Sequence, residues 1–439
     1  MTDLEAFLST SPLCDTHEHL RSEERWIHEG PDILTDIFGA YLQADLHSAG
    51  ASAEALVQLN DSSNPDLLAR FLGIREAWEH CRFTGYGRAA KLLATEVHGM
   101  EAFDEESLQA ANKRLLAWRR PRGRLALLRE RGKLDHVQVD DFTWACEPDA
   151  DGFFYQDLSW LDFSSGQVDP QALYRATGCQ VCDLADLDDA MSALFALYGS
   201  VAIAVKTQHA YRRALSWGER TRSEAESALQ QVLAGGDVSC EARHCLGDWC
   251  LARGIELAIP LGLPVKIHVG IHAGNDRMPL AWISAAHLSP LLARYPKAIF
   301  VLMHTGYPYT DEVIALAKHY RNVFVDLCWA WAISPRHTAD FVRRFLHAVP
   351  ANKLFAFGGD TRWPTGALAY SIQARQGLAG ALALDVGEGF MTEPEAIALA
   401  AGFLWKNQYA CFPRLGDAPV YPVPPQGFGE LQRDPSVRL

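Results

Sequence analysis

The sequence predicts an α/β fold, a TIM-type (β/α)8 barrel with a helical insertion after its first strand. Eight short apolar runs have the composition of parallel strands that are buried on both faces. Most of these runs alternate with amphipathic helices, as crossover connections between parallel strands require. A long stretch of helical periodicity, residues 21–133, separates the first run from the second.

The first strand is expected at residues 13–19, where the chain reads LCDTHEH. The other seven are expected in HVQVD (136–140), FFYQDLSWLDF (153–163), SVAIAVK (200–206), PVKIHVG (264–270), AIFVLMHTG (298–306), NVFVDLCW (322–329) and KLFAFGGD (353–360). Eight strands is the number that closes a (β/α)8 barrel.

Helices are expected at 64–83 and 104–120 inside the insertion, and at 222–235, 240–258, 288–295, 311–320 and 338–349 between the later strands. The expected domains are a barrel formed by residues 1–20 and 134–415, and a helical cap formed by residues 21–133. The proline-rich tail, 416–439, is expected to pack as an extended arm or to stay loose.

The composition excludes several classes of protein. A formal net charge of −14 argues against a nucleic-acid binder. No apolar run is long enough to span a membrane, and the first residues, MTDLEAFLST, lack the pattern of a signal peptide. The ten cysteines have no regular spacing and are interpreted as reduced thiols, so a cytoplasmic protein with a small-molecule substrate is expected.

Polar residues close five of the predicted strands. They are His17 with His19, Lys206, His268, His304 and Asp360. The carboxyl ends of the strands carry the active site of a (β/α)8 barrel, and imidazoles and carboxylates bind Zn²⁺, Mn²⁺ or Fe²⁺. A single histidine at a strand end is more often structural, but two on one strand followed by four such residues on later strands predict a metal site.

Strand alternation places Asp15, His17 and His19 on one face and Thr16 and Glu18 on the other. Glu18 is therefore expected to have a structural role. Gly358 and Gly359 are expected to let the chain turn so that the next residue, Asp360, faces inward.

This order of metal-binding residue types resembles the amidohydrolase superfamily, whose members are metal-dependent enzymes on a distorted (β/α)8 barrel. The segments VKTQHAYRR and VLMHTGYPYTDEVIALAKHYRNVFVDL resemble the amidohydrolase-2 group, which includes domains fused to glutamine-synthetase-like domains. The helical insertion and HVGIHAGNDRM are similar to uronate isomerases. The resemblance covers residues 10–20 and 135–410.

The resemblance implies a role for each residue. His17 and His19 would bind the more buried ion, and Asp360 would ligate it and accept a proton from the attacking water. His268 and His304 would bind a second ion, or His268 would join the first and His304 would polarise the substrate. Lys206 falls where many members carry a carbamylated lysine that bridges two ions; otherwise it would contact substrate or extend to solvent. One or two divalent ions are implied, with Zn²⁺ preferred over Mn²⁺ or Fe²⁺.

The reaction that follows is hydrolysis of an amide, lactone or related bond. Uronate-type isomerisation is the main alternative, but isomerases of this group lack the residues matching Lys206 and His304. Nonoxidative decarboxylation and a barrel without catalysis are weaker alternatives. Members of the superfamily are often homo-oligomers, and the apolar fraction of 49% permits this.

Several side chains near the strand ends are candidate substrate ligands. The guanidinium groups of Arg212, Arg277 and Arg362 match carboxylates and predict an acidic substrate group. Tyr211 and Trp331 are candidates for stacking on the substrate, although aromatic residues at a barrel mouth often only pack it.

Overall fold

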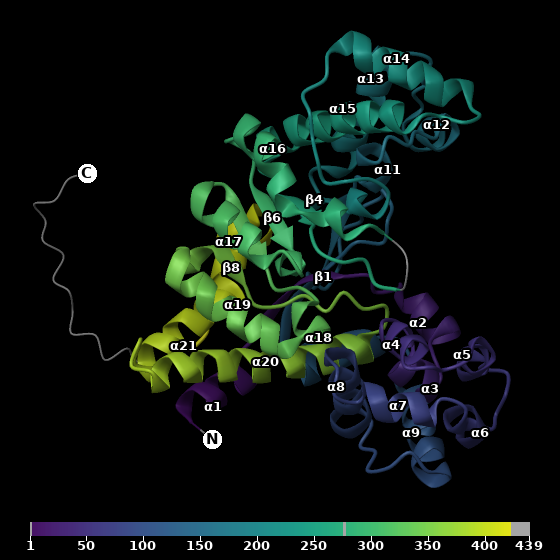
Figure 1. Ribbon diagram of the computed structural model, residues 1–439, viewed down its shortest axis with the longest axis vertical. Helices are drawn as coiled ribbons and strands as arrows, with labels where there is room; N and C mark the ends of the chain where they lie inside the picture. Colours follow the sequence, from purple (N-terminus) through teal and green to yellow (C-terminus); the bar gives the residue numbers. More distant parts are fainter. Residues whose placement is uncertain (1, 275–277, 423–439) are drawn as a thin grey trace, which may run out of the picture.

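Eight parallel strands follow one another in sequence order around a nearly closed barrel, which confirms the predicted fold class (Figure 1). The computed structural model describes residues 2–274 and 278–422. The strands are β1 (Leu13–Glu18), β2 (Leu134–Val139), β3 (Phe154–Ser159), β4 (Ala204–Thr207), β5 (Val265–His268), β6 (Phe300–Met303), β7 (Val323–Asp326) and β8 (Leu354–Phe355). Each lies within or overlaps one of the eight apolar runs.

The barrel closes between β8 and β1, next to the predicted site. Although β8 is only two residues long, the chain that follows it runs along β1. The backbone N–H of Thr16 donates to the carbonyl of Phe357 at 3.1 Å, and that of Asp360 donates to the carbonyl of His17 at 3.0 Å. Since all strands are parallel, their carboxyl ends meet at one rim.

Helices surround the barrel, and there are more of them than the one helix per strand that a (β/α)8 barrel needs. They are α1 (Asp3–Thr10), α2 (Glu23–Glu29), α3 (Ile33–Phe38), α4 (Leu42–Ser48), α5 (Ala53–Asn60), α6 (Leu67–Leu72), α7 (Arg75–Cys81), α8 (Gly85–Leu92), α9 (Glu105–Trp118), α10 (Gly123–Leu125), α11 (Leu161–Ser164), α12 (Pro170–Thr177), α13 (Leu184–Tyr198), α14 (Arg222–Ala234), α15 (Cys240–Ala258), α16 (Ser289–Arg294), α17 (Thr310–His319), α18 (Ala330–Ile333), α19 (Pro335–Ala348), α20 (Pro364–Gly387), α21 (Glu393–Ala401) and α22 (Asn407–Cys411).

Helices α2–α10 lie between β1 and β2 and pack around an apolar core of their own, which we call the cap core. Its largest buried side chains include Trp26, Phe38, Phe71 and Trp78. The helix expected at 64–83 is two helices, α6 and α7, which are separated at Gly73. Glycine has the poorest helix propensity after proline, and such a break lets both helices face the same core.

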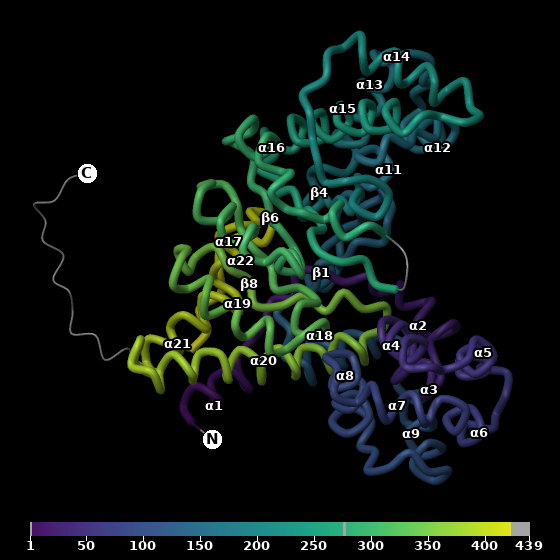
Figure 2. The backbone as a smooth tube through the Cα atoms, viewed as in Figure 1, coloured from purple at the N-terminus to yellow at the C-terminus, as the bar shows by residue number. Residues whose placement is uncertain are grey.

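The long helix α20 joins the cap to the barrel (Figures 1 and 2). One end of it packs against α1 and α21, and the other packs against α8. Its residues Leu368 and Ala369 belong to the cap core. Among the described residues, no helix combines the length and apolar character that crossing a membrane would need.

Candidate metal centre

Three side chains converge at the rim where β1 and the chain after β8 lie side by side. The Nε2 atoms of His17 and His19 lie 3.4 and 3.2 Å from Oδ1 of Asp360. Ligand atoms about 2.0–2.1 Å from a tetrahedral ion are separated by about 3.3 Å, so these distances fit the edges of a Zn²⁺-sized coordination shell. The residues present therefore fit a divalent ion.

Hydrogen bonding leaves the converging atoms free to bind an ion. Nδ1–H of His19 donates to the carbonyl of Asp140 at 2.6 Å, which leaves Nε2 with its lone pair toward Asp360. Both ring nitrogens of His17 and Oδ1 of Asp360 are buried and have no hydrogen-bond partner among the described residues. Buried polar atoms are rarely left unpartnered, and a metal ion would satisfy these.

The two later histidines differ from each other. Nδ1–H of His304 donates to the carbonyl of Cys328 at 3.0 Å, while its buried Nε2 has no partner within the described chain. His268 accepts from the hydroxyl of Tyr211 at Nδ1 and donates from Nε2 to the carbonyl of Ile271, each at 3.2 Å. Its ring centroid lies 4.3 Å from that of His304. His304 thus offers a free nitrogen, whereas both nitrogens of His268 are engaged.

Lys206 is buried, with 1% of its surface exposed, at the end of β4. No hydrogen bond or ion pair joins its ammonium to another described residue. Its charge nevertheless lowers the pKa of His17 and of His304, so it lies close to the cluster. The same charge lowers the pKa of Asp140 against the effect of burial, so the ammonium lies close to carboxylates of the barrel rim as well as to the imidazoles.

The electrostatics keep most of the ligands in the state that binds metal. Burial lowers the pKa of His304 to about 3 and lowers that of His17, so both are neutral imidazoles at neutral pH. Burial also lowers the pKa of His268. Burial alone would raise the pKa of Asp360, but the His17 and His19 imidazoles hold it well below its ordinary value.

The backbone is strained at two of these residues. His304 and Asp360 have φ angles of 62° and 59°, in the left-handed region that residues with a Cβ rarely adopt. Such conformations cost on the order of 1–3 kcal/mol and cluster at functional sites. The glycines before Asp360 serve close approach rather than a turn. A Cβ at Gly358 would lie 2.8 Å from Sγ of Cys328, and one at Gly359 would lie 2.0 Å from Oε1 of Glu18.

The simple alternation expected along β1 holds for His17 and His19, which both face Asp360, but it is wrong for Asp15 and Glu18. The pairing of β1 with β2 shifts register between Leu13 and Asp15 and again between Asp15 and Glu18. The irregularity brings the carboxyl groups of Asp15 and Glu18 together instead of placing them on opposite faces. Burial, followed by the Asp15 carboxyl, raises the pKa of Glu18 well above its ordinary value.

A cavity of about 680 Å³ lies between the barrel rim and the cap. Its floor includes His19, Asp140 and Asp360, and helices α3, α4, α5 and α8 form the opposite wall. Its volume is within the range of small-molecule sites. Tyr41 of the cap lines the cavity, and its hydroxyl donates to the carbonyl of Asp360 at 2.5 Å. The cap is therefore part of the site.

The side chains considered as substrate ligands lie in different places. Tyr211 and Arg362 line the cavity, and the Tyr211 ring stacks on His272 with 3.9 Å between centroids. Arg212 instead pairs with Asp162 at 2.6 Å and is not part of the cavity lining. The indole N–H of Trp331 donates to the carbonyl of Ala356 in the core. Arg277 lies outside the described residues.

The sequence analysis does not single out three buried carboxylates, two at strand ends and one within β3. Asp140 accepts from the amide of Gln208 at 2.6 Å, and Asp326 accepts from the hydroxyl of Thr16 at 2.6 Å. Asp157 pairs with the buried Lys266 at 2.8 Å and lies 3.8 Å from Nδ1 of His17. The signal that found Asp360, a polar residue closing an apolar strand, applies equally to Asp140 and Asp326.

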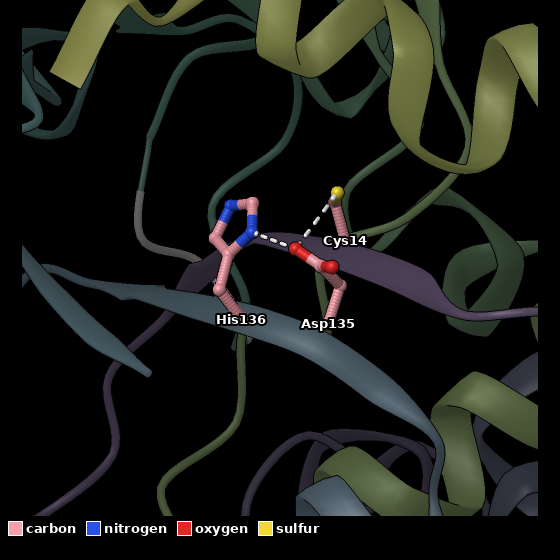
Figure 3. Close-up of side chains that lie close together, drawn as sticks. All are labelled: Cys14, Asp135 and His136. Atoms are coloured by element: carbon pink, nitrogen blue, oxygen red, sulfur yellow. Dashed lines mark hydrogen bonds and ion pairs between the residues drawn. The ribbon is translucent and has the colours of Figure 1, made fainter. Parts of the chain in front are cut away.

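A second group of metal-binding residue types lies at the other end of β1 (Figure 3). It contains Cys14 of β1 and Asp135 and His136 of β2. Here Oδ2 of Asp135 accepts from Nδ1–H of His136 at 2.7 Å and faces Sγ of Cys14 at 3.8 Å. The hydroxyls of Tyr409 and Tyr421 also donate to Asp135. Since donors already occupy this carboxylate, the cluster has the properties of a structural network.

Comparison with known proteins places the chain in a family. The amidohydrolase family model matches residues 155–396, more than half of the chain, which includes β4 to β8 and leaves out β1 and the cap. Protein fluG of Emericella nidulans is 30% identical over 200 residues. That match takes in 44% of this chain and 23% of fluG, so the chain spans less than a quarter of the length of that relative.

Two solved structures have the same fold over nearly the whole chain. The uronate isomerase of Thermotoga maritima superposes with a TM-score of 0.77 at 14% identity, covering 93% of this chain and 96% of the isomerase. The glucuronate isomerase of Caulobacter crescentus gives 0.76 at 18% identity, covering 96% and 95%. At these identities the likeness concerns the fold, cap included. With more than half of its length matched by the family model, the chain belongs to the amidohydrolase family.

Proposed function

We propose that this protein is a metal-dependent hydrolase that cleaves an amide, lactone or related bond in a small acidic substrate. The observation that carries the proposal is the set of buried, unpartnered ligand atoms on His17, Asp360 and His304. Family membership supports a divalent metal in this place. Zn²⁺ suits two imidazoles and a carboxylate best, with Mn²⁺ or Fe²⁺ as alternatives.

A divalent ion at this position would lower the pKa of a coordinated water to about 7. His17 and His19 would hold the ion, and the Asp360 carboxylate, ionised at neutral pH, would accept the proton of the attacking water and return it to the leaving group. His304 lies in the same cluster as Asp360, and its Nε2, which carries a lone pair, would bind a second ion or accept a hydrogen bond from a hydroxyl or N–H of the substrate. The cap would exclude bulk water from the cavity.

The acidic character of the substrate rests on cations without partners. The guanidinium groups of Arg21 and Arg362 line the cavity, and neither has an anionic partner among the described residues. A substrate carboxylate would supply one. Carbamylation would convert the Lys206 ammonium into an anionic ligand, and it would accompany binding of two ions.

Uronate-type isomerisation is the second candidate. It is favoured by the superposition of the whole chain, cap included, on uronate and glucuronate isomerases. The presence of Lys206 and His304 favours hydrolysis, because these positions supply the bridging and polarising groups of the hydrolases that the sequence resembles.

The test begins with metal content, measured by plasma mass spectrometry on freshly purified protein. Protein with bound metal is then incubated with N-acyl amino acids, lactones, glucuronate and galacturonate, and products are followed by NMR. New carboxylate and amine or hydroxyl signals would support hydrolysis. Appearance of a ketose from a uronate would establish the isomerase instead. Absence of metal after reconstitution with Zn²⁺, Mn²⁺ and Fe²⁺ would overturn both.

A further inference from the structure

Glu18 lies between the two histidines in the sequence but directs its carboxyl group toward the segment that carries Asp360. It is fully buried, with 0% exposure. Its Oε2 accepts the backbone N–H of Thr361 at 2.5 Å and the hydroxyl of the same residue at 2.9 Å. One carboxylate oxygen thus fixes both the main chain and the side chain of the residue that follows Asp360.

The residue before Asp360 is held from the same strand. The backbone N–H of Gly359 lies 3.4 Å from Oδ1 of Asp15, and a Cβ on this glycine would collide with the Glu18 carboxyl at 2.0 Å. The backbone N–H of Asp360 itself donates to the carbonyl of His17 at 3.0 Å. Three consecutive residues, 359–361, are therefore bound to β1.

These contacts matter because Asp360 has a conformation that the chain would not adopt unaided. Its φ of 59° is in the left-handed region, where a residue with a Cβ is strained. A strained backbone conformation is kept only when the contacts around the residue hold it in place. The hydrogen bonds to Thr361 are the side-chain contacts that fix the chain immediately after the strained residue.

We propose that Glu18 is a positioning residue, which holds the Gly359–Thr361 segment so that the Asp360 carboxylate meets the His17 and His19 imidazoles at metal-binding distance. It acts through Thr361 and is not itself a ligand. The inference rests on the proposed metal centre. In this proposal Glu18 joins the two segments that carry the ligands, β1 and residues 359–361.

The test uses Co²⁺ alone as the probe, on the full chain prepared free of metal. Binding is measured by calorimetry, and the visible absorption of bound Co²⁺ reports the geometry of its ligands. The variants are Glu18→Ala, which removes both hydrogen bonds to Thr361, and Glu18→Gln, whose amide oxygen can still accept them. Asp385→Asn is the matched control, since Asp385 of α20 is equally buried but accepts from Arg343 of α19.

Loss of a residue that supports a metal ligand typically weakens metal binding about 10–100-fold. We expect Glu18→Ala to weaken Co²⁺ binding by that factor and to change the visible spectrum, and Glu18→Gln to restore both to near the parent. Asp385→Asn should lower the unfolding temperature and leave the spectrum unchanged. A folded Glu18→Ala protein with parental affinity and spectrum would overturn the proposal.

If Glu18→Ala does not fold, a milder variant tests the same proposal. Glu18→Asp keeps the carboxyl group but shortens the side chain by one methylene, so that it cannot reach Thr361 in the same way. We expect it to fold, to bind Co²⁺ more weakly than Glu18→Gln does, and to alter the spectrum; parental behaviour of Glu18→Asp would overturn the proposal. A parent chain that binds no Co²⁺ would instead refute the metal centre itself.

Discussion

The two ends of strand β1 carry similar residues and use them differently. At the carboxyl end, His17, His19 and Asp360 converge, and the lone pairs of His17 and of Oδ1 of Asp360 are buried with no donor. At the amino end, Cys14, Asp135 and His136 lie equally close together, but every oxygen of Asp135 accepts from a neighbour. Proximity of ligand types therefore does not distinguish a metal site from a structural network; the occupancy of the lone pairs does.

The largest effect should come from removing ligands at the carboxyl end. In His17→Ala/His19→Ala, bound metal should fall from about one ion per chain to nearly none, and activity should fall with it, because only Asp360 and His304 remain to hold the ion. The matched variant, Cys14→Ala/His136→Ala, should retain its metal. Plasma mass spectrometry of both proteins decides the comparison, and metal loss from the second variant would make the amino end a metal site as well.

A pair of aspartate substitutions should separate catalysis from stability. Asp360→Asn should reduce turnover on the order of 10²–10⁴-fold because the proton acceptor is lost. Asp135→Asn should leave turnover unchanged and reduce the free energy of unfolding by about 1–3 kcal/mol, since buried donors lose their acceptor. Steady-state kinetics and denaturant unfolding of both variants provide the measurement. Equal turnover in Asp360→Asn and the parent would contradict the proposed mechanism.

Much of this contrast could be predicted from the sequence, because it depends on strand order. Apolar runs identify the strands, and the polar residues that close them identify the rim that carries the site. These residues are His17, His19, Lys206, His304 and Asp360. The engagement of each lone pair could not be predicted, since it depends on residues far away in the chain. Tyr41, for example, reaches the carbonyl of Asp360 across 319 positions.

Local irregularity also limited the prediction. Alternation placed Glu18 away from the histidines, but the register shifts in β1 bring it to Asp15 and Thr361. Such shifts are set by pairing with β2, more than 100 residues later, and leave no periodic signal in β1. Arg212, predicted as a substrate ligand, instead pairs with the carboxylate of Asp162. Its position after a strand does not reveal this pairing.

The two ends should also respond to different ranges of pH. Burial lowers the pKa of His19, but the carboxylates of Asp360 and Asp140 outweigh it and raise the pKa above 6.5 in the metal-free chain. Protons therefore compete with the ion for His19 as the pH falls, and metal affinity should begin to fall above pH 6.5, by about tenfold per unit below the His19 pKa.

The amino end should be insensitive in that range. Burial would raise the pKa of Asp135, but its hydrogen bonds with His136 and the two tyrosines lower it. Its contribution to stability is therefore present above the unfolded pKa of about 3.9 and is lost only as the pH falls through the lower folded value. Metal affinities and unfolding free energies measured from pH 4 to 8 test both statements; a metal affinity that is flat between pH 5.5 and 8 would contradict the first.

The smallest effects should come from two tyrosine hydroxyls. Tyr86 of the cap lines the cavity, and its hydroxyl is buried without a partner among the described residues. Its ring stacks with those of Tyr41 and Trp329, at 5.6 and 6.1 Å between centroids. A buried hydroxyl without a partner costs free energy, and a substrate oxygen that accepted its hydrogen bond would recover that cost.

Tyr86→Phe should therefore leave the free energy of unfolding unchanged or slightly higher, and raise KM about 2–10-fold, as for one lost neutral hydrogen bond of about 0.5–1.5 kcal/mol. Tyr409→Phe removes a hydroxyl that donates to Asp135 at 2.8 Å, and should do the reverse, lowering stability by about 1 kcal/mol with KM unchanged. If Tyr86→Phe lowers stability and leaves KM as it was, its hydroxyl belongs to the packing of the cap, and the cavity recognises its substrate from the barrel side alone.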